Sequence, residues 1–121
     1  MQVVRKIENN VTILDVEGVV KLGESARAFS TSLDQVLRED FGPILINFEA
    51  VEYMDSTGLG ELIGYLQKFN QGGRSLALVK PSHRILSLLK LTRLDAVFNI
   101  FQSTSEAMAF LTGGNDSQPQ S

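Results

Sequence analysis

The chain has 121 residues, 43% of them hydrophobic and 21% charged, which suffices for one buried core and leaves no room for a second domain. Its net charge of -3 excludes a global basic field that would attract nucleic acid. Its lack of cysteine excludes disulfides and thiolate metal sites. Residues 1–6 form no apolar signal region and charged residues interrupt every hydrophobic segment, so we expect a cytoplasmic protein without a membrane span.

The first third of the chain predicts a hairpin followed by a helix. Val3–Ile7 and Val11–Val16 alternate as strands do, and Asn9-Asn10 between them suits a turn with positive φ. A helix is expected from Gly23-Glu24 to just before Gly42-Pro43. Its apolar stripe consists of Ala26, Phe29, Leu33, Val36 and Leu37.

Strands and helices then alternate to the end of the domain. The expected elements are a strand at Ile44–Phe48, a helix at Thr57–Asn70, a strand at Ser75–Val79, a leucine-rich helix from Pro81-Ser82, a short edge strand at Val97–Phe101 and a helix at Thr104–Leu111. This order predicts an α/β fold whose mixed sheet of four to five strands is parallel in its centre, with about four helices packed over it. Residues 113–121 contain no apolar side chain, so we expect a domain at residues 1–112 and a disordered tail.

The segment Tyr53–Gly60 displays a hydroxyl at a junction between a strand and a helix. The first N–H groups of a helix lack intrahelical partners and carry partial positive charge, so Asp55, Ser56 or Thr57 can cap the helix. Capping does not explain the two glycines that follow, each of which costs roughly 1 kcal/mol against alanine within a helix.

Glycine at Gly58 and Gly60 would let another backbone come close. Gly60 and Gly64 lie four residues apart and would leave a smooth groove along the helix, either for a partner or for the sheet beneath. Residue types alone leave both readings open: a cap with close internal packing, or a recognition site.

The string Asp55-Ser56-Thr57-Gly58-Leu59-Gly60, preceded by a hydrophobic strand, resembles the signature of the STAS domain family, specifically the bacterial anti-sigma factor antagonists. The similarity covers roughly residues 3–112 and includes Gly72-Gly73, Leu76–Val79, the leucines between residues 85 and 94, and Ser105-Glu106-Ala107. The resemblance implies a STAS-like α/β fold.

The resemblance also implies a protein-binding switch and not a catalyst. The phosphoacceptor would be Ser56, with Thr57 as the neighbouring alternative. The implied partners are an anti-sigma factor with serine kinase activity, which the unmodified protein sequesters to free a sigma factor, and a serine phosphatase. No cofactor is expected, since ATP would belong to the kinase. A phosphate adds about 1.5 to 2 negative charges, which a helix N-terminus tolerates and a close interface does not.

One position departs from the family pattern. Many members have an aspartate after a Gly-x-Leu segment in the second strand, and the local equivalent here is Gly18-Val19-Val20-Lys21. Lys21 replaces the acid, and Glu24 could occupy part of its role. The expected partner-binding residues are Lys21, Glu24, Asp55, Ser56, Thr57, Gly58, Leu59, Gly60 and Gly64.

Other chemistry finds little support in the sequence. A hydrolase nucleophile elbow needs Gly-x-Ser-x-Gly, but Met54 stands where its first glycine belongs, and His83 is the sole histidine. Glu49, Glu52 and Asp55 have no histidine or cysteine companions, so we expect no metal. The Gly-x4-Gly-Lys-Ser/Thr spacing of a phosphate-binding loop is absent.

Two further readings concern surfaces. Lys80, His83, Arg84, Lys90 and Arg93 form a basic cluster, interpreted as a solvated helix face that could steer an acidic partner; direct DNA binding is not expected. The alternative functions are a constitutive scaffold in a signalling complex and an accessory subunit of a lipid transporter. Small-molecule binding at the strand ends rests on analogy with other α/β folds.

Overall fold

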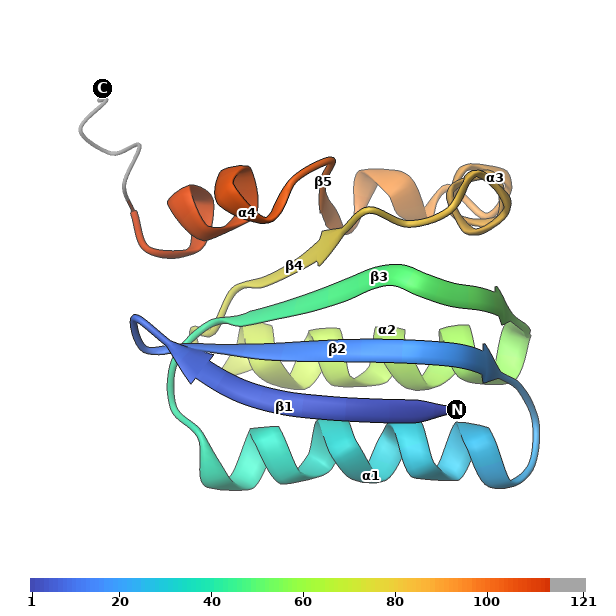
Figure 1. Cartoon of the computed structure of the whole chain (residues 1–121), viewed down its shortest axis with the longest axis horizontal. Coiled ribbons are helices and arrows are strands. Elements are labelled where there is room, and N and C mark those ends of the chain that lie inside the picture. The colour runs from blue at the N-terminus through green and yellow to red at the C-terminus, as the bar shows by residue number, and fades with distance from the viewer. Residues whose placement is uncertain (114–121) are drawn as a thin grey trace.

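Five strands form one mixed sheet in the order β1-β2-β3-β4-β5 (Figure 1). The computed structural model describes residues 1–113. The strands are β1 (Gln2–Glu8), β2 (Val11–Val20), β3 (Ile44–Met54), β4 (Leu76–Val79) and β5 (Asn99–Phe101). The helices are α1 (Glu24–Glu39), α2 (Ser56–Gln71), α3 (His83–Leu91) and α4 (Thr104–Leu111), with a 3-10 turn at Leu94–Ala96. The predicted fold class and the predicted number of strands and helices are confirmed. The tail predicted from residue 113 lies, except for Gly113, outside the described residues.

The N-terminal hairpin forms as its sequence predicts. β1 pairs antiparallel with β2, and the turn residues Asn9 and Asn10 have φ of 51° and 67°. Asparagine reaches this left-handed region at lower cost than most residues because its short polar side chain can hydrogen-bond locally. The remaining neighbours, β2 with β3, β3 with β4 and β4 with β5, are all parallel.

The third strand is longer than its sequence pattern indicates. The strand was expected at Ile44–Phe48, whereas β3 continues to Met54. The extension pairs with the second half of β2, where Gly18 lies opposite Val51 and Val20 opposite Met54, and the register shifts twice along the way. Val51 and Met54 are buried in this extension while the residues between them are exposed. Such a pattern lacks strict alternation and therefore resembles a loop.

Helices cover the two faces of the sheet unequally. The larger core lies under α1 and α2 and contains Phe29, Phe48 and Phe69, all fully buried. A smaller core on the other face is closed by Ala107 of α4 against β2, β3 and β4. In residues 1–113, no helix is both long enough and apolar enough to cross a membrane.

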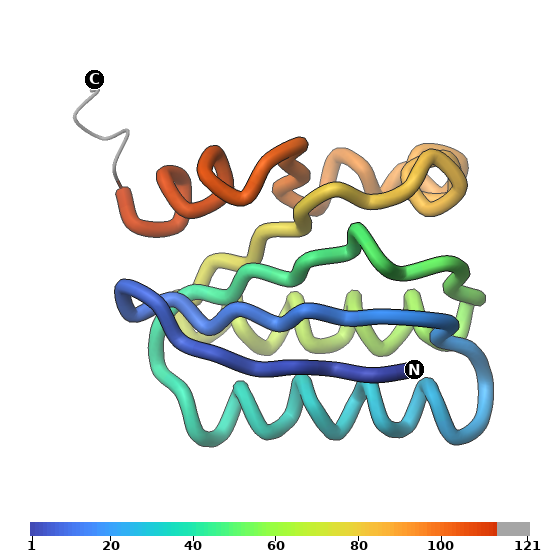
Figure 2. The backbone as a smooth tube through the Cα atoms, viewed as in Figure 1, coloured from blue at the N-terminus to red at the C-terminus, as the bar shows by residue number. Residues whose placement is uncertain are grey.

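The parallel strands bring three strand-to-helix connections to one edge of the sheet. β2, β3 and β4 all lead out of the sheet at their carboxyl ends into α1, α2 and α3, and the backbone tube in Figure 2 shows the turns after β2 and β3 at the same end of the molecule. The carboxyl ends of parallel strands are where α/β folds commonly place their sites. The junction between β3 and α2, which carries Ser56, lies at this edge.

Candidate functional site

Asp55 caps α2 and also ties it to the preceding connection. One carboxylate oxygen, Oδ1, accepts the backbone N–H of Gly58 at 3.0 Å, which is the expected geometry for an N-cap residue. The other, Oδ2, accepts the backbone N–H of Leu22 at 2.8 Å from the connection between β2 and α1. The Asp55 N–H in turn donates to the carbonyl of Val20 at 3.1 Å. Of the three residues that could cap this helix, Asp55 does so.

The connection between β2 and α1 is itself held by short contacts. The Lys21 N–H donates to Ser25 Oγ at 2.9 Å, and the Ser25 hydroxyl lies 3.1 Å from the Lys21 carbonyl. Gly23 precedes α1 with φ of 109°, a conformation that side chains strongly disfavour. Lys21 and Glu24 are both exposed in this connection, next in sequence to the backbone that Asp55 binds. The structure therefore brings the connection that contains Lys21 and Glu24 beside the start of α2.

Ser56 is the first residue of α2 and is exposed, whereas Thr57 is half-buried. A helix start carries partial positive charge from its unpaired N–H groups and summed peptide dipoles. Ser56 therefore presents a hydroxyl to solvent at a place that favours negative charge.

The other four residues of α2 that were expected to bind a partner divide between the inside and the outside of the molecule. Gly58 and Leu59 are buried, while Gly60 is exposed and Gly64 is half-buried. A Cβ on Gly58 would lie 2.9 Å from Val20 Cγ1, whereas a Cβ on Gly60 or Gly64 would meet nothing within 4 Å. Gly58 thus serves internal packing against β2, and the small residues available to a partner are Gly60 and Gly64.

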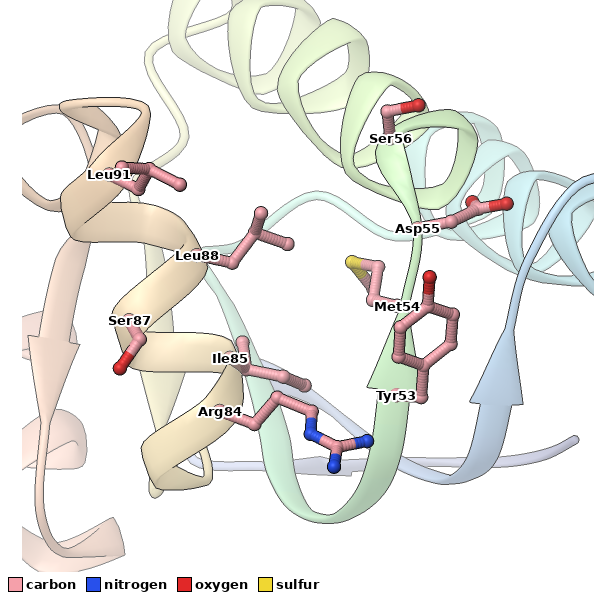
Figure 3. A pocket seen from close by; sticks show the side chains of 9 residues that line it. All are labelled: Tyr53, Met54, Asp55, Ser56, Arg84, Ile85, Ser87, Leu88 and Leu91. Carbon is pink, nitrogen blue, oxygen red and sulfur yellow. The ribbon is translucent and has the colours of Figure 1, made fainter.

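A groove of about 320 Å³ opens beside Ser56, between the end of β3 and α3. Figure 3 shows Leu88 and Leu91 extending from α3 toward Met54, and the Arg84 side chain reaching across toward Tyr53. We call this feature the α3 groove; its lining residues are Tyr53, Met54, Asp55, Ser56, Arg84, Ile85, Ser87, Leu88 and Leu91. The basic residues around α3 were predicted to lie on a solvated helix face, and one of them, Arg84, lines the same groove as Ser56. The lining residues come from two segments separated by α2 and β4, and no local pattern joins them.

Within residues 1–113, the structure places no histidine among the residues that line the groove beside Ser56. His83 is exposed at the first residue of α3 and is not among the residues that line the groove. Within the part of the chain that the structure describes, no cluster of three or more histidine, cysteine, aspartate or glutamate residues could hold a metal. Glu49 pairs with Lys80 at 3.6 Å instead of joining Glu52 and Asp55 in a carboxylate site.

Residues 2–107 match the family model described as STAS domain. The chain belongs to the STAS domain family. A candidate anti-sigma factor antagonist of Thermotoga maritima is 32% identical over 104 residues, which cover 85% of this chain and 91% of the relative. An anti-sigma-B factor antagonist of Staphylococcus aureus is 36% identical over 90 residues, 70% of this chain and 83% of the relative. The resemblance inferred from the Ser56 segment is confirmed.

Solved structures agree with this STAS fold. The crystal structure of a candidate anti-sigma factor antagonist from Thermotoga maritima superimposes with a TM-score of 0.84 at 30% identity, covering 90% of this chain and 93% of that one. The anti-sigma factor antagonist SpoIIAA in its unphosphorylated form gives 0.71 at 15% identity, covering 93% and 99%. The Bacillus cell fate determinant SpoIIAA in its phosphorylated form gives 0.70 at 16%, covering 88% and 96%. At these identities SpoIIAA supports the fold alone.

The two glycines give opposite predictions for stability. Gly58→Ala should lower the free energy of unfolding by about 1 to 3 kcal/mol, because the new methyl group would collide with Val20 and Met54. Gly60→Ala should raise it by roughly 0.5 to 1 kcal/mol, because the methyl group meets open space and alanine favours the helix. Urea unfolding of both variants measures the difference; equal effects would show that Gly58 does not pack closely on β2.

The Asp55 cap predicts a pH-dependent stability. Hydrogen bonds from the N–H groups of Gly58 and Leu22 lower the pKa of Asp55 below its ordinary value. A carboxylate whose folded-state pKa is depressed stabilises the fold above its unfolded pKa and loses that contribution as pH falls through the folded pKa. Wild type should therefore be more stable than Asp55→Asn at pH 7, and the difference should shrink below about pH 4. Unfolding curves measured across this range would contradict the assignment if the difference between the two proteins were constant.

Proposed function

We propose that this STAS domain is an anti-sigma factor antagonist whose binding is switched by phosphorylation of Ser56. The observation that carries the proposal is the exposed Ser56 hydroxyl at the first residue of α2, beside the Asp55 carboxylate that holds the helix start in place. The relatives from Thermotoga maritima and Staphylococcus aureus, whose names describe them as anti-sigma factor antagonists, support it.

The position of Ser56 suits a modification that changes a surface and preserves the fold. A phosphate there would gain from the positive end of α2 and would not be buried, because Ser56 is exposed. The charge of the phosphate would weaken the binding of a partner that packs closely over Ser56. In SpoIIAA, the phosphorylated and the unphosphorylated forms both have folds similar to that of this chain, which is the behaviour we propose here.

The proposed partner is an anti-sigma factor with serine kinase activity, with a serine phosphatase to reverse the modification. The unmodified protein would sequester the anti-sigma factor in the cytoplasm and so free a sigma factor. Its contact surface would comprise Lys21, Glu24, Asp55, Ser56, Thr57, Gly60 and Gly64, while Gly58 and Leu59 support it from beneath. No cofactor or catalytic group of this chain is required.

Lys21 would bias the switch without determining it. An ammonium near the phosphate favours the phosphorylated form, but exposed pairs of this kind are worth only about 0.2 to 1 kcal/mol. Lys21 is exposed in the connection that Asp55 holds. Glu24, exposed at the first residue of α1, would partly offset that cation.

The test uses each anti-sigma factor encoded in the same genome, purified and assayed separately for phosphate transfer and for binding. At least one should phosphorylate the wild type on Ser56 and leave Ser56→Ala unlabelled. Ser56→Asp and Gly60→Arg should weaken its binding roughly tenfold or more, the first by charge and the second by bulk. Ser105→Asp is the matched control, because Ser105 is exposed in the first turn of α4 on the other face of the sheet.

Calorimetry and peptide mass spectrometry read out the two assays, and thermal unfolding confirms that each variant is folded. Phosphate found on Thr57 alone would reject Ser56 as the acceptor. Equal binding by wild type and Ser56→Asp would favour a constitutive scaffold over a switch. Binding by none of the anti-sigma factors, each shown to bind its own sigma factor, would reject the proposed function.

A further inference from the structure

The α3 groove combines an apolar floor with exposed apolar side chains at its rim. Met54 and Ile85 on its floor are 3% and 2% exposed, whereas Tyr53 and Leu91 are 41% and 83% exposed. A leucine exposed to this degree gains free energy when a second surface removes it from water. The rim of the groove therefore presents apolar side chains that remain exposed to water in the folded protein and that a binding partner could cover.

Positive charge is concentrated in α3 and the residues that flank it. Residues 80–93 contain Lys80, Arg84, Lys90 and Arg93 and no acid, in a chain with 11 basic and 14 acidic residues. The rest of the chain thus has seven basic residues against all 14 acidic ones. A positive helix on a negative protein creates a local field that an acidic surface would recognise.

Most of the cations in and around α3 form no ion pair within residues 1–113. Lys80 forms an ion pair with Glu49, but among residues 1–113 no ion pair involves Arg84, Lys90 or Arg93. Arg84 lines the groove, whereas Lys90 is exposed on the same helix outside the lining. One cation without an ion-pair partner, Arg84, therefore stands in the groove, and Lys90 adds to the positive field of the same helix.

We propose that the α3 groove binds a segment of the anti-sigma factor that carries acidic and leucine-like side chains. This inference rests on the proposed function. Asp55 and Ser56 line the groove together with Arg84, so a partner seated over Ser56 covers the groove as well. The acidic side chains of the segment complement Arg84 in the groove and the positive field to which Lys90 contributes, and its apolar side chains cover Leu88 and Leu91.

The same arrangement explains how a phosphate on Ser56 would act. Ser56 stands on one rim of the groove and α3 forms the other (Figure 3). A phosphate on that rim repels an acidic segment directly and competes with it for the cations of α3. The switch then depends on charge in the groove in addition to steric fit over Gly60.

The first arm of the test needs no identified partner. The probe is a short synthetic peptide of Glu-Leu-Leu-Glu repeats, titrated into nitrogen-15-labelled protein, with a Lys-Leu-Leu-Lys peptide as control. Backbone shifts should be confined to Tyr53, Ser56 and α3, and Ser56→Asp should weaken binding several-fold. No response, shifts elsewhere, or equal binding of the lysine peptide would overturn the inference. Binding of α3 to anionic vesicles or to a second copy of the chain, without a response to the glutamate peptide, would do the same.

The second arm measures the rates of association and dissociation with an anti-sigma factor that binds the wild type in the calorimetric assay of the proposed function. Arg84→Glu combined with Lys90→Glu should slow association roughly tenfold at low ionic strength, and salt should reduce this effect. Leu91→Ser should speed dissociation by roughly tenfold. Lys6→Glu is a single charge reversal that serves as the control for position, since Lys6 is exposed on β1 at the opposite edge of the sheet, and it should change neither rate more than about twofold.

The two proposals fail in distinguishable ways. If the anti-sigma factor binds and responds to Ser56→Asp but ignores the α3 variants, the groove inference is wrong and the Ser56 switch stands. If no anti-sigma factor binds the wild type, the proposed function fails, and the peptide titration still decides whether the groove recognises an acidic segment.

Discussion

The site depends on one carboxylate that joins two connections of the sheet. Asp55 accepts an N–H from Gly58 inside its own helix and another from Leu22 in the connection before α1. The parallel pairing of β2 with β3 makes this possible, because Val20 and Met54 end side by side and deliver both connections to one edge. Without that pairing, the starts of α1 and α2 would have no common anchor, and the exposed Ser56 would stand on an unsupported turn.

The start of α2, which Asp55 caps, contains both residues that pack inside the fold and residues that a partner can reach. Gly58 and Leu59 face inward, where even one added methyl group on Gly58 would press on Val20. Ser56 and Gly60 face outward with free space around the Gly60 position. A small residue therefore serves a different purpose at each position: Gly58 permits close packing against β2, and Gly60 leaves the surface unobstructed. A modification of Ser56 can then change what a partner meets while the contacts beneath stay in place.

Local signals in the sequence predicted much of this architecture, and the parts that they missed depend on distant contacts. The paired asparagines predicted the hairpin because their conformational preference is local, and Asp55 was one of three residues expected to cap α2. The end of β3 was missed because Glu49, Ala50, Glu52 and Tyr53 are exposed and only pairing with β2 makes them a strand. The α3 groove was missed because its two walls meet only after α2 and β4 have folded between them.

Hydrogen exchange of the protein carrying phosphoserine at position 56, compared with the unmodified protein, tests the central claim most directly. If the Asp55 anchor holds the junction independently of Ser56, protection of β2, β3 and the interior of α2 should be unchanged. Differences should be confined to residues 20–24, residues 55–60 and the facing side of α3. Loss of protection along β3 or through α2 on phosphorylation would contradict the account, because the phosphate would then be altering the fold and not only the surface that a partner meets.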